Sequence, residues 1–158
     1  MGFNESIVYR LANQEDALKL AVLLWEHYEE LSEVDYNIKD DYITACLEDI
    51  KYRLGKELFC YIAENNGLIV SHIFLLITHK LPKIGRPNAS YARISTVRTI
   101  PKYRNQGIGS ILMDYIKKYC MEKNVEELVV FGPTEKSISF YERAGFKREN
   151  EVMEINFD

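Results

Sequence analysis

Two glycines separate a segment with strand character from a segment with helix character near the middle of the chain. Residues 90–99 have the pattern of a strand, and apolar residues recur at helical spacing after Gly109. The first N–H groups of a helix have no internal partner, and the helix dipole adds partial positive charge there. Because Gly107 and Gly109 allow close approach to the backbone, this strand, turn and helix start indicate a phosphate-binding site.

Two familiar phosphate-binding motifs are excluded at this turn. A dinucleotide fingerprint requires a third glycine three residues after Gly109, where this chain has Leu112. A P-loop requires lysine directly after its last glycine, where this chain has Ser110. The two glycines alone would also fit a tight turn that binds no ligand.

A longer pattern separates these possibilities. Residues 104–109, Arg-Asn-Gln-Gly-Ile-Gly, match (Q/R)-x-x-G-x-(G/A), and residues 137–146 place Phe-Tyr shortly before Gly-Phe. The two blocks occur in this order, with one helix and one strand between them. Together they resemble the acetyl-CoA-binding motif and the later motif of the GNAT superfamily of N-acetyltransferases. The resemblance covers roughly residues 90–150, and the segment from Arg86-Pro87-Asn88 through the phosphate turn resembles a bacterial subgroup whose substrates are mostly unassigned.

The resemblance implies that acetyl-CoA (coenzyme A) is the cofactor. In the family, two adjacent parallel strands splay apart, and the pantetheine arm pairs with the backbone of one of them, here residues 95–99. Thr134 occupies a position where the later motif often has asparagine, which has a longer side chain. The residues expected to bind the cofactor are Val97, Arg98, Thr99, Arg104, Asn105, Gln106, Gly107, Ile108, Gly109, Ser110 and Thr134.

The resemblance also assigns Tyr141 the role of general acid. The implied reaction is direct attack of an amine on the acetyl thioester in a ternary complex. A phenol with a pKa near 10 can protonate the departing thiolate. Without the flanking motif residues, Tyr141 would be taken for a core tyrosine, since the chain has eleven tyrosines. A backbone N–H of Val97 or Thr99 is expected to polarise the carbonyl.

The general base is not assigned by the sequence. Some family members carry a carboxylate on the strand before the phosphate turn, but residues 93–99 contain no acid. Elsewhere, six titratable residues are candidates: Glu26, Glu29, Glu30, Glu64, His72 and His79. Each is more readily explained as a structural or solvated residue, and a chain of water molecules could equally accept the proton. A covalent acyl-cysteine route is not expected, because neither motif contains cysteine.

The resemblance also implies that the acceptor amine lies beside residues 29–37 and 79–88. The first segment is acidic and could attract a cationic amine such as a polyamine, an aminoglycoside or a lysine side chain, although a solvated helix end has the same composition. We therefore predict a small-molecule amine acceptor. The alternatives are transfer to a protein N-terminus or lysine, and a non-catalytic module that senses acyl-CoA.

Composition limits the remaining possibilities. A chain of 158 residues with 47% hydrophobic and 28% charged content predicts one domain over residues 1–158. The net charge of −4 argues against nucleic acid as a partner, while Arg98, Lys102 and Arg104 form a local cationic cluster that should favour a polyanionic cofactor.

Targeting signals and metal-binding patterns are also missing from the sequence. Three separated cysteines predict neither a disulfide framework nor a metal site. With no signal peptide or apolar run of membrane length, the expected location is the cytoplasm, with no membrane partner. A homodimer is possible, because dimers are common in the family.

The hydrophobic pattern predicts the element order β-α-α-β-β-β-α-β-α-β, an α/β domain with a mixed sheet. The predicted strands are residues 7–11, 58–63, 68–77, 90–99 and 127–131, with a final strand pair within 146–157. The predicted helices are residues 15–31 and 39–54, the segment after Gly109, and 137–144. The helical crossover implies that strands 90–99 and 127–131 are parallel. The GNAT fold has the same order, and its strand arrangement is taken from the resemblance.

Overall fold

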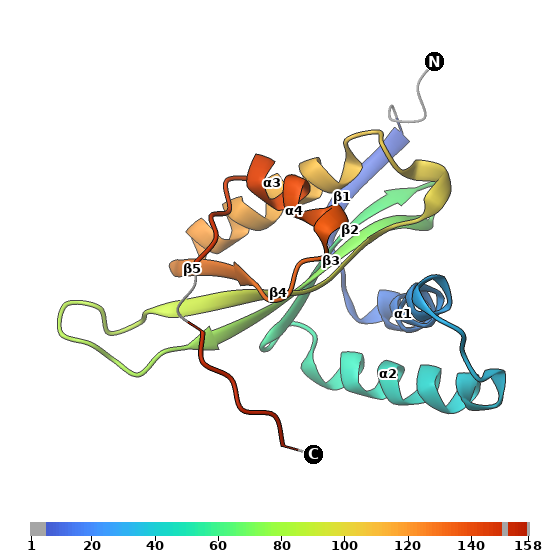
Figure 1. Ribbon diagram of the computed structural model, residues 1–158, viewed down its shortest axis with the longest axis horizontal. Coiled ribbons are helices and arrows are strands. Elements are labelled where there is room, and N and C mark those ends of the chain that lie inside the picture. Colours follow the sequence, from blue (N-terminus) through green and yellow to red (C-terminus); the bar gives the residue numbers. More distant parts are fainter. Residues whose placement is uncertain (1–5, 150–151, 158) are drawn as a thin grey trace.

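Five strands form one mixed sheet in the order β1-β2-β3-β4-β5 (Figure 1). The computed structural model describes residues 6–149 and 152–157. The strands are β1 (Ile7–Leu11), β2 (Leu58–Asn65), β3 (Leu68–His79), β4 (Ser90–Thr99) and β5 (Val125–Val130). The first four pair antiparallel, whereas β4 and β5 are parallel. The predicted mixed sheet and its parallel crossover are confirmed.

Helices cover both faces of this sheet (Figure 1). One face carries α1 (Ala17–Leu31) and α2 (Lys39–Arg53), and the other carries α3 (Ile108–Glu122) and α4 (Glu135–Arg143). Each face has its own apolar core, centred on Leu20 and Ile62 on the first side and on Ile73 and Leu112 on the second. Strand β3 is buried continuously from Ile69 to Leu75, so its predicted central position is confirmed.

Strands β2 and β3 are joined by the predicted Asn-Gly hairpin turn. Asn66 and Gly67 both have positive φ, at 48° and 82°. This is the conformation for which a two-residue hairpin selects asparagine and glycine.

Strands β4 and β5 separate partway along their length. Their pairing runs from Ser90 opposite Val125 to Ile94 opposite Val130, and no described residue continues it. On its other side, β4 stays paired with β3 as far as Thr99. Ser95 is an extra residue in β4, because Phe74 and Leu75 pair with Thr96 and Ile94. The divergence implied by the family resemblance is therefore present.

The predicted final strand pair is wrong for the described residues. Residues 146–149 and 152–157 contain no strand, and residues 150 and 151 lie outside the described part. Apolar residues at Val152, Met153, Ile155 and Phe157 suggested a strand, but all four are exposed. Apolar patterning alone does not make a strand, because a strand also needs hydrogen bonds to a neighbour. Within the described residues, no helix has the length and apolar character required to cross a membrane.

Candidate active site

A groove of about 710 Å³ lies where β4 and β5 separate. Its walls come from residues 95–99 of β4, the turn and start of α3, the end of β5, the loop after it, α4, and two residues of α1. Every residue predicted to bind the cofactor lines this groove except Gln106, and so does Tyr141. The Gln106 side chain instead donates a hydrogen bond to the Lys102 carbonyl at 3.2 Å.

The open half of β4 presents backbone groups to this groove. Ile100 donates its N–H to the Val70 carbonyl of β3, and Arg98 is paired with His72 two positions further along. Because hydrogen-bonding pairs alternate along antiparallel strands, the N–H and C=O of Arg98 face β3, whereas those of Val97 and Thr99 face away. Of the three predicted backbone contacts, Val97 and Thr99 thus offer a strand edge, and the Arg98 backbone faces the sheet.

The turn before α3 has the backbone geometry of an anion site. Gly107 is the N-cap of α3 in the left-handed conformation, with φ of 79°, and no side chain caps this end of the helix. The first hydrogen bond to the Gly107 carbonyl comes from Ile111, so the N–H groups of residues 108–110 precede the helical ladder. These donors and the helix dipole favour negative charge at the turn.

Gly109 brings the two sequence motifs into contact. A Cβ atom added at Gly109 would lie 3.4 Å from the Phe140 ring, at van der Waals contact distance. The start of α3 therefore lies directly beside Phe140 of α4. Thr134 ends the loop before α4, and its hydroxyl donates to Ser137 Oγ at 3.1 Å.

Tyr141 is buried beside two aromatic rings. Its ring centroid lies 5.1 Å from that of Phe140 and 5.4 Å from that of Phe146. Burial raises the pKa of the Tyr141 phenol, so the hydroxyl keeps its proton at neutral pH. The residue is 8% exposed and lines the groove, which gives it the protonation state that a general acid requires.

The predicted cationic cluster is largely neutralised by acids of α1. Arg98 is buried and bonds Glu30, and its second nitrogen lies 3.4 Å from Glu26. Arg104 bonds the other oxygen of Glu30 at 2.6 Å and donates Nε–H to the Thr99 carbonyl at 2.8 Å. Burial opposes ionisation of Glu30, but the two arginines outweigh it and lower the pKa of this carboxyl. The cluster thus joins α1 to β4 as well as providing positive charge.

None of the six candidates for the general base lines the groove. Glu29 accepts a hydrogen bond from the Trp25 indole at 2.5 Å, and Glu64 pairs with Arg10 at 2.9 Å. His79 ends β3 at an exposed position. Glu26 and Glu30 are the partners of Arg98, and so the carboxylates among the candidates already have cationic or hydrogen-bonding partners.

His72, the sixth candidate, is enclosed by the protein. It is 1% exposed, and neither ring nitrogen has a hydrogen-bond partner among the described residues. Burial, with smaller contributions from Arg98 and His27, lowers the pKa of His72 to about 3. A base this weak cannot take a proton from an amine near neutral pH.

His27 is a groove residue that the sequence analysis did not single out. It lies on α1 and lines the groove together with Leu31. Its spacing from Leu20, Leu24 and Leu31 places it on a helix stripe that faces the sheet. A titratable residue within an apolar stripe was the signal that could have identified it.

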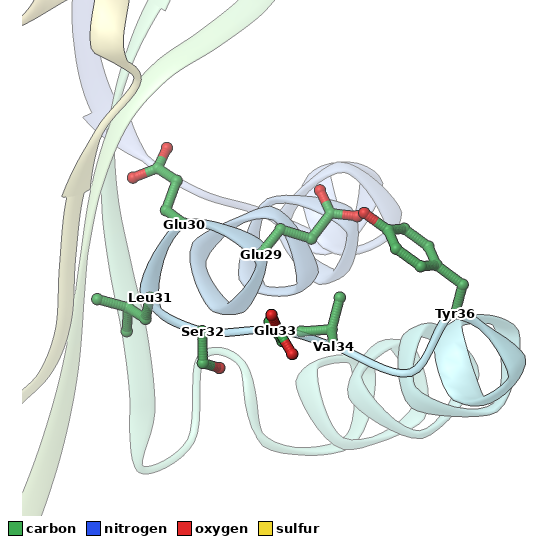
Figure 2. A pocket seen from close by; sticks show the side chains of 7 residues that line it. All are labelled: Glu29, Glu30, Leu31, Ser32, Glu33, Val34 and Tyr36. Atoms are coloured by element: carbon green, nitrogen blue, oxygen red, sulfur yellow. The ribbon is translucent and has the colours of Figure 1, made fainter.

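The acidic segment expected to attract the acceptor is mostly occupied by internal contacts. Figure 2 shows that Glu30 points away from Glu33, and that Glu29 points toward Tyr36. Glu30 holds the two arginines, while Asp35 accepts a hydrogen bond from the Asn37 backbone at 2.9 Å. Residues 29–34 and Tyr36 line a second hollow, which shares Leu31 with the groove.

The second segment expected near the acceptor, residues 79–88, does not line the groove. Residues 80–89 connect β3 to β4 and form the projecting loop in Figure 1. Lys80 and Arg86 pair with Glu126 of β5, and no residue of this loop lines the groove. The loop lies at the start of β4, whereas the groove follows its end.

Comparison with known proteins agrees with this architecture. Residues 20–146 match the model of the Acetyltransferase (GNAT) family. A glucosamine 6-phosphate N-acetyltransferase of Trypanosoma brucei brucei is 29% identical over 114 residues, which cover 71% of this chain and 74% of that protein.

Solved structures show the same fold at low sequence identity. A predicted acetyltransferase from Clostridium acetobutylicum, with acetyl-CoA, has a TM-score of 0.75 at 20% identity and matches over 95% of this chain and 96% of its own. The glucosamine-6-phosphate N-acetyltransferase of Arabidopsis thaliana has a TM-score of 0.68 at 17% identity and matches over 98% of this chain and 100% of its own. Because the family model spans more than half of the sequence, the chain belongs to the GNAT family and is an acetyl-CoA-dependent N-acetyltransferase.

Proposed function

We propose that this protein transfers the acetyl group of acetyl-CoA to the amine of a small molecule, by direct attack in a ternary complex. One observation carries the proposal: a single groove combines a strand edge at Val97 and Thr99 that has no partner strand among the described residues, a helix start at Gly107 and the phenol of Tyr141. These are the parts needed to hold an extended thioester, bind its phosphates and protonate its leaving group.

The chemistry of the groove fits acetyl-CoA. Among the described residues that line it there is no aspartate or glutamate, whereas Arg104, Lys136 and Arg143 contribute positive charge. The N–H groups at the start of α3 would receive the pyrophosphate, and the edge at Val97 and Thr99 would pair with the amides of the pantetheine arm. When bound, acetyl-CoA supplies an activated acyl group as a thioester.

The residues around that thioester have distinct roles. An N–H of Val97 or Thr99 donates to the carbonyl oxygen and stabilises the negative charge that develops there. Tyr141 holds its proton in the resting state, because burial raises the pKa of its phenol. It gives that proton to the thiolate as the carbon–sulfur bond breaks.

Amino-sugar phosphates are a second class of candidate acceptor, in addition to cationic amines. The relative from Trypanosoma brucei brucei is a glucosamine 6-phosphate N-acetyltransferase. Lys136 and Arg143 of α4 line the groove, and the acids of α1 mostly have internal partners. This charge distribution favours an amine that also carries a phosphate, so an amino-sugar phosphate is the second candidate acceptor.

The test pairs acetyl-CoA calorimetry with an amine screen and a matched tyrosine exchange. Acetyl-CoA should bind, and the protein should form free coenzyme A thiol from it when at least one of spermidine, kanamycin and glucosamine 6-phosphate is added. Tyr141→Phe should lower kcat by about 100-fold or more while acetyl-CoA affinity is kept. Tyr119→Phe is the control, because Tyr119 is equally buried, at 7% exposed, and does not line the groove.

Two results would contradict the proposal. If the folded protein bound no acetyl-CoA, the groove would not be the cofactor site. If Tyr141→Phe retained full turnover, the leaving thiolate would take its proton from another donor.

A further inference from the structure

The groove needs a group that removes a proton from the acceptor, and its lining contains one suited to that task. The titratable side chains in the lining are His27, Arg98, Tyr103, Arg104, Lys136, Tyr141 and Arg143. At neutral pH, arginine, lysine and tyrosine side chains ordinarily hold their protons. Among the described lining residues, His27 alone is of a type that can be unprotonated at pH 7 and accept a proton.

His27 contributes to the groove from α1, whereas the proposed phosphate-binding turn precedes α3. It lies between Leu24 and Leu31 on the stripe of α1 that faces the sheet, and the groove wall beside it is the open half of β4. The base candidates Glu26 and Glu30 flank it on the same helix, but both are held by Arg98. His27 therefore differs from Glu26 and Glu30: it lines the groove, whereas they form ion pairs with Arg98.

The surroundings of His27 favour its neutral form. Partial burial lowers the pKa of the imidazole, and Arg98 of β4 and Arg104 of the turn lower it further. Glu30 of α1 opposes them, and His72 of β3 is neutral. The ring of Tyr28 also lies against His27, with the two ring centroids 6.2 Å apart. No hydrogen bond from a described residue contributes to this pKa, so a ring nitrogen is available to a ligand.

We propose that His27 is the general base that deprotonates the acceptor amine, an inference that rests on the proposed function. The ammonium nitrogen of the acceptor gives one proton to the His27 imidazole. The lone pair of the acceptor nitrogen then forms the carbon–nitrogen bond as the carbon–sulfur bond breaks. Tyr141 gives its proton to sulfur and regains the remaining excess proton from nitrogen, and His27 releases its proton to water. The products are an amide, a free thiol and one proton.

The first test exchanges histidine for glutamine at two positions. His27→Gln should lower kcat by about 100-fold with whichever of spermidine, kanamycin and glucosamine 6-phosphate is turned over, because glutamine cannot accept the proton. Its acetyl-CoA affinity should stay within about twofold of the parent, since the pyrophosphate site is unchanged. His79→Gln is the control, because His79 is exposed and outside the groove.

The pH profile separates catalysis from packing. In the parent, kcat should fall as the pH drops through the lowered pKa of His27, since the protonated ring cannot act as a base. His27→Gln should lose this limb and respond only to deprotonation of the amine itself. A purely structural role for His27 would lower kcat at every pH and leave the limb in place.

A second measurement does not depend on the acceptor. Nuclear magnetic resonance of ring-labelled histidine in the acetyl-CoA complex should find His27 neutral at pH 7. A protonated ring at pH 7 would overturn the inference, as would undiminished turnover in His27→Gln. Either result could occur while acetyl-CoA binding and the Tyr141→Phe defect remain, so the proposed function would survive it.

Discussion

The two halves of β4 differ in their neighbours. Residues 90–94 have β3 on one side and β5 on the other, so the backbone N–H groups on both edges lie beside a partner strand. Residues 95–99 have only β3, and the backbone of Val97 and Thr99 faces the groove instead. The same strand therefore serves as scaffold in its first half and as binding edge in its second.

Side-chain chemistry changes at the same place. The first half buries Ala92 and Ile94 in the apolar core beneath α3. The second half buries Arg98, which pairs with acids of α1 and faces His72 in the register of β3. Apolar packing supports the scaffold half, whereas the binding half depends on charge and on backbone groups that have no strand partner.

Proline substitutions at one position in each half of β4 test this difference most directly. Ala92→Pro should destabilise the protein by about 3 kcal/mol or more, because it removes a ladder hydrogen bond inside the sheet. Val97→Pro removes an N–H that faces the groove, so the fold should persist while acetyl-CoA affinity falls about tenfold. Thermal unfolding and calorimetry measure the two effects. Equal loss of stability in both variants would show that Val97 has a strand partner after all.

A glutamate in the turn before α3 should impair acetyl-CoA binding while the fold is kept. Gly107→Glu places bulk and negative charge at the start of α3 and should weaken acetyl-CoA binding by about 100-fold, or about 2.7 kcal/mol. Gly67→Glu is the matched control, because Gly67 has φ of 82° against 79° for Gly107 and equally open surroundings. Calorimetry that finds equal affinities in the two variants would place the phosphates away from this turn.

The pH dependence of stability should come in part from His72 of β3, which is paired with Arg98 in the binding half. His72 has a pKa near 3 in the folded protein against an ordinary value of 6.5, so the unfolded chain binds the proton first as the pH falls. This group should remove about 2 kcal/mol of stability between pH 7 and pH 5. His72→Leu should flatten that part of the curve in denaturant titrations, whereas His79→Leu should not. A parent curve that is flat over this range would mean that the folded protein protonates His72 as readily as the unfolded chain does.

Much of the fold follows from local sequence. The alternation and helical spacing of apolar residues predicted five strands and four helices close to their positions, because these patterns reflect which faces are buried. Asn66 and Gly67 predicted their turn from backbone preference alone. The motif residues were also brought together as expected, with Gly107 and Tyr141 in one groove.

Long-range pairing could not be read in the same way. That Glu30 holds both Arg98 and Arg104 depends on the placement of α1 over β4, which no local pattern encodes. Residues 79–88 were expected near the acceptor, yet they do not line the groove, because they precede β4. His27 was missed because a histidine among leucines is usually a packed residue, and its role depends on what lies across from it.

The extra residue Ser95 has a consequence for how β4 tolerates insertions and deletions. Side chains alternate between the faces of a strand, so one added residue reverses the alternation beyond it. Ala92 and Ile94 point toward α3, and with the added residue Val97 does as well, while Arg98 points toward α1. Removing Ser95 would place Thr96 directly after Ile94 and opposite Phe74, so Val97 and Arg98 would keep their faces and only the bulge would be lost. The bulge therefore absorbs one residue of strand length, and we expect deletion of Ser95 to preserve both the buried arginine and the groove-facing backbone of Val97 and Thr99.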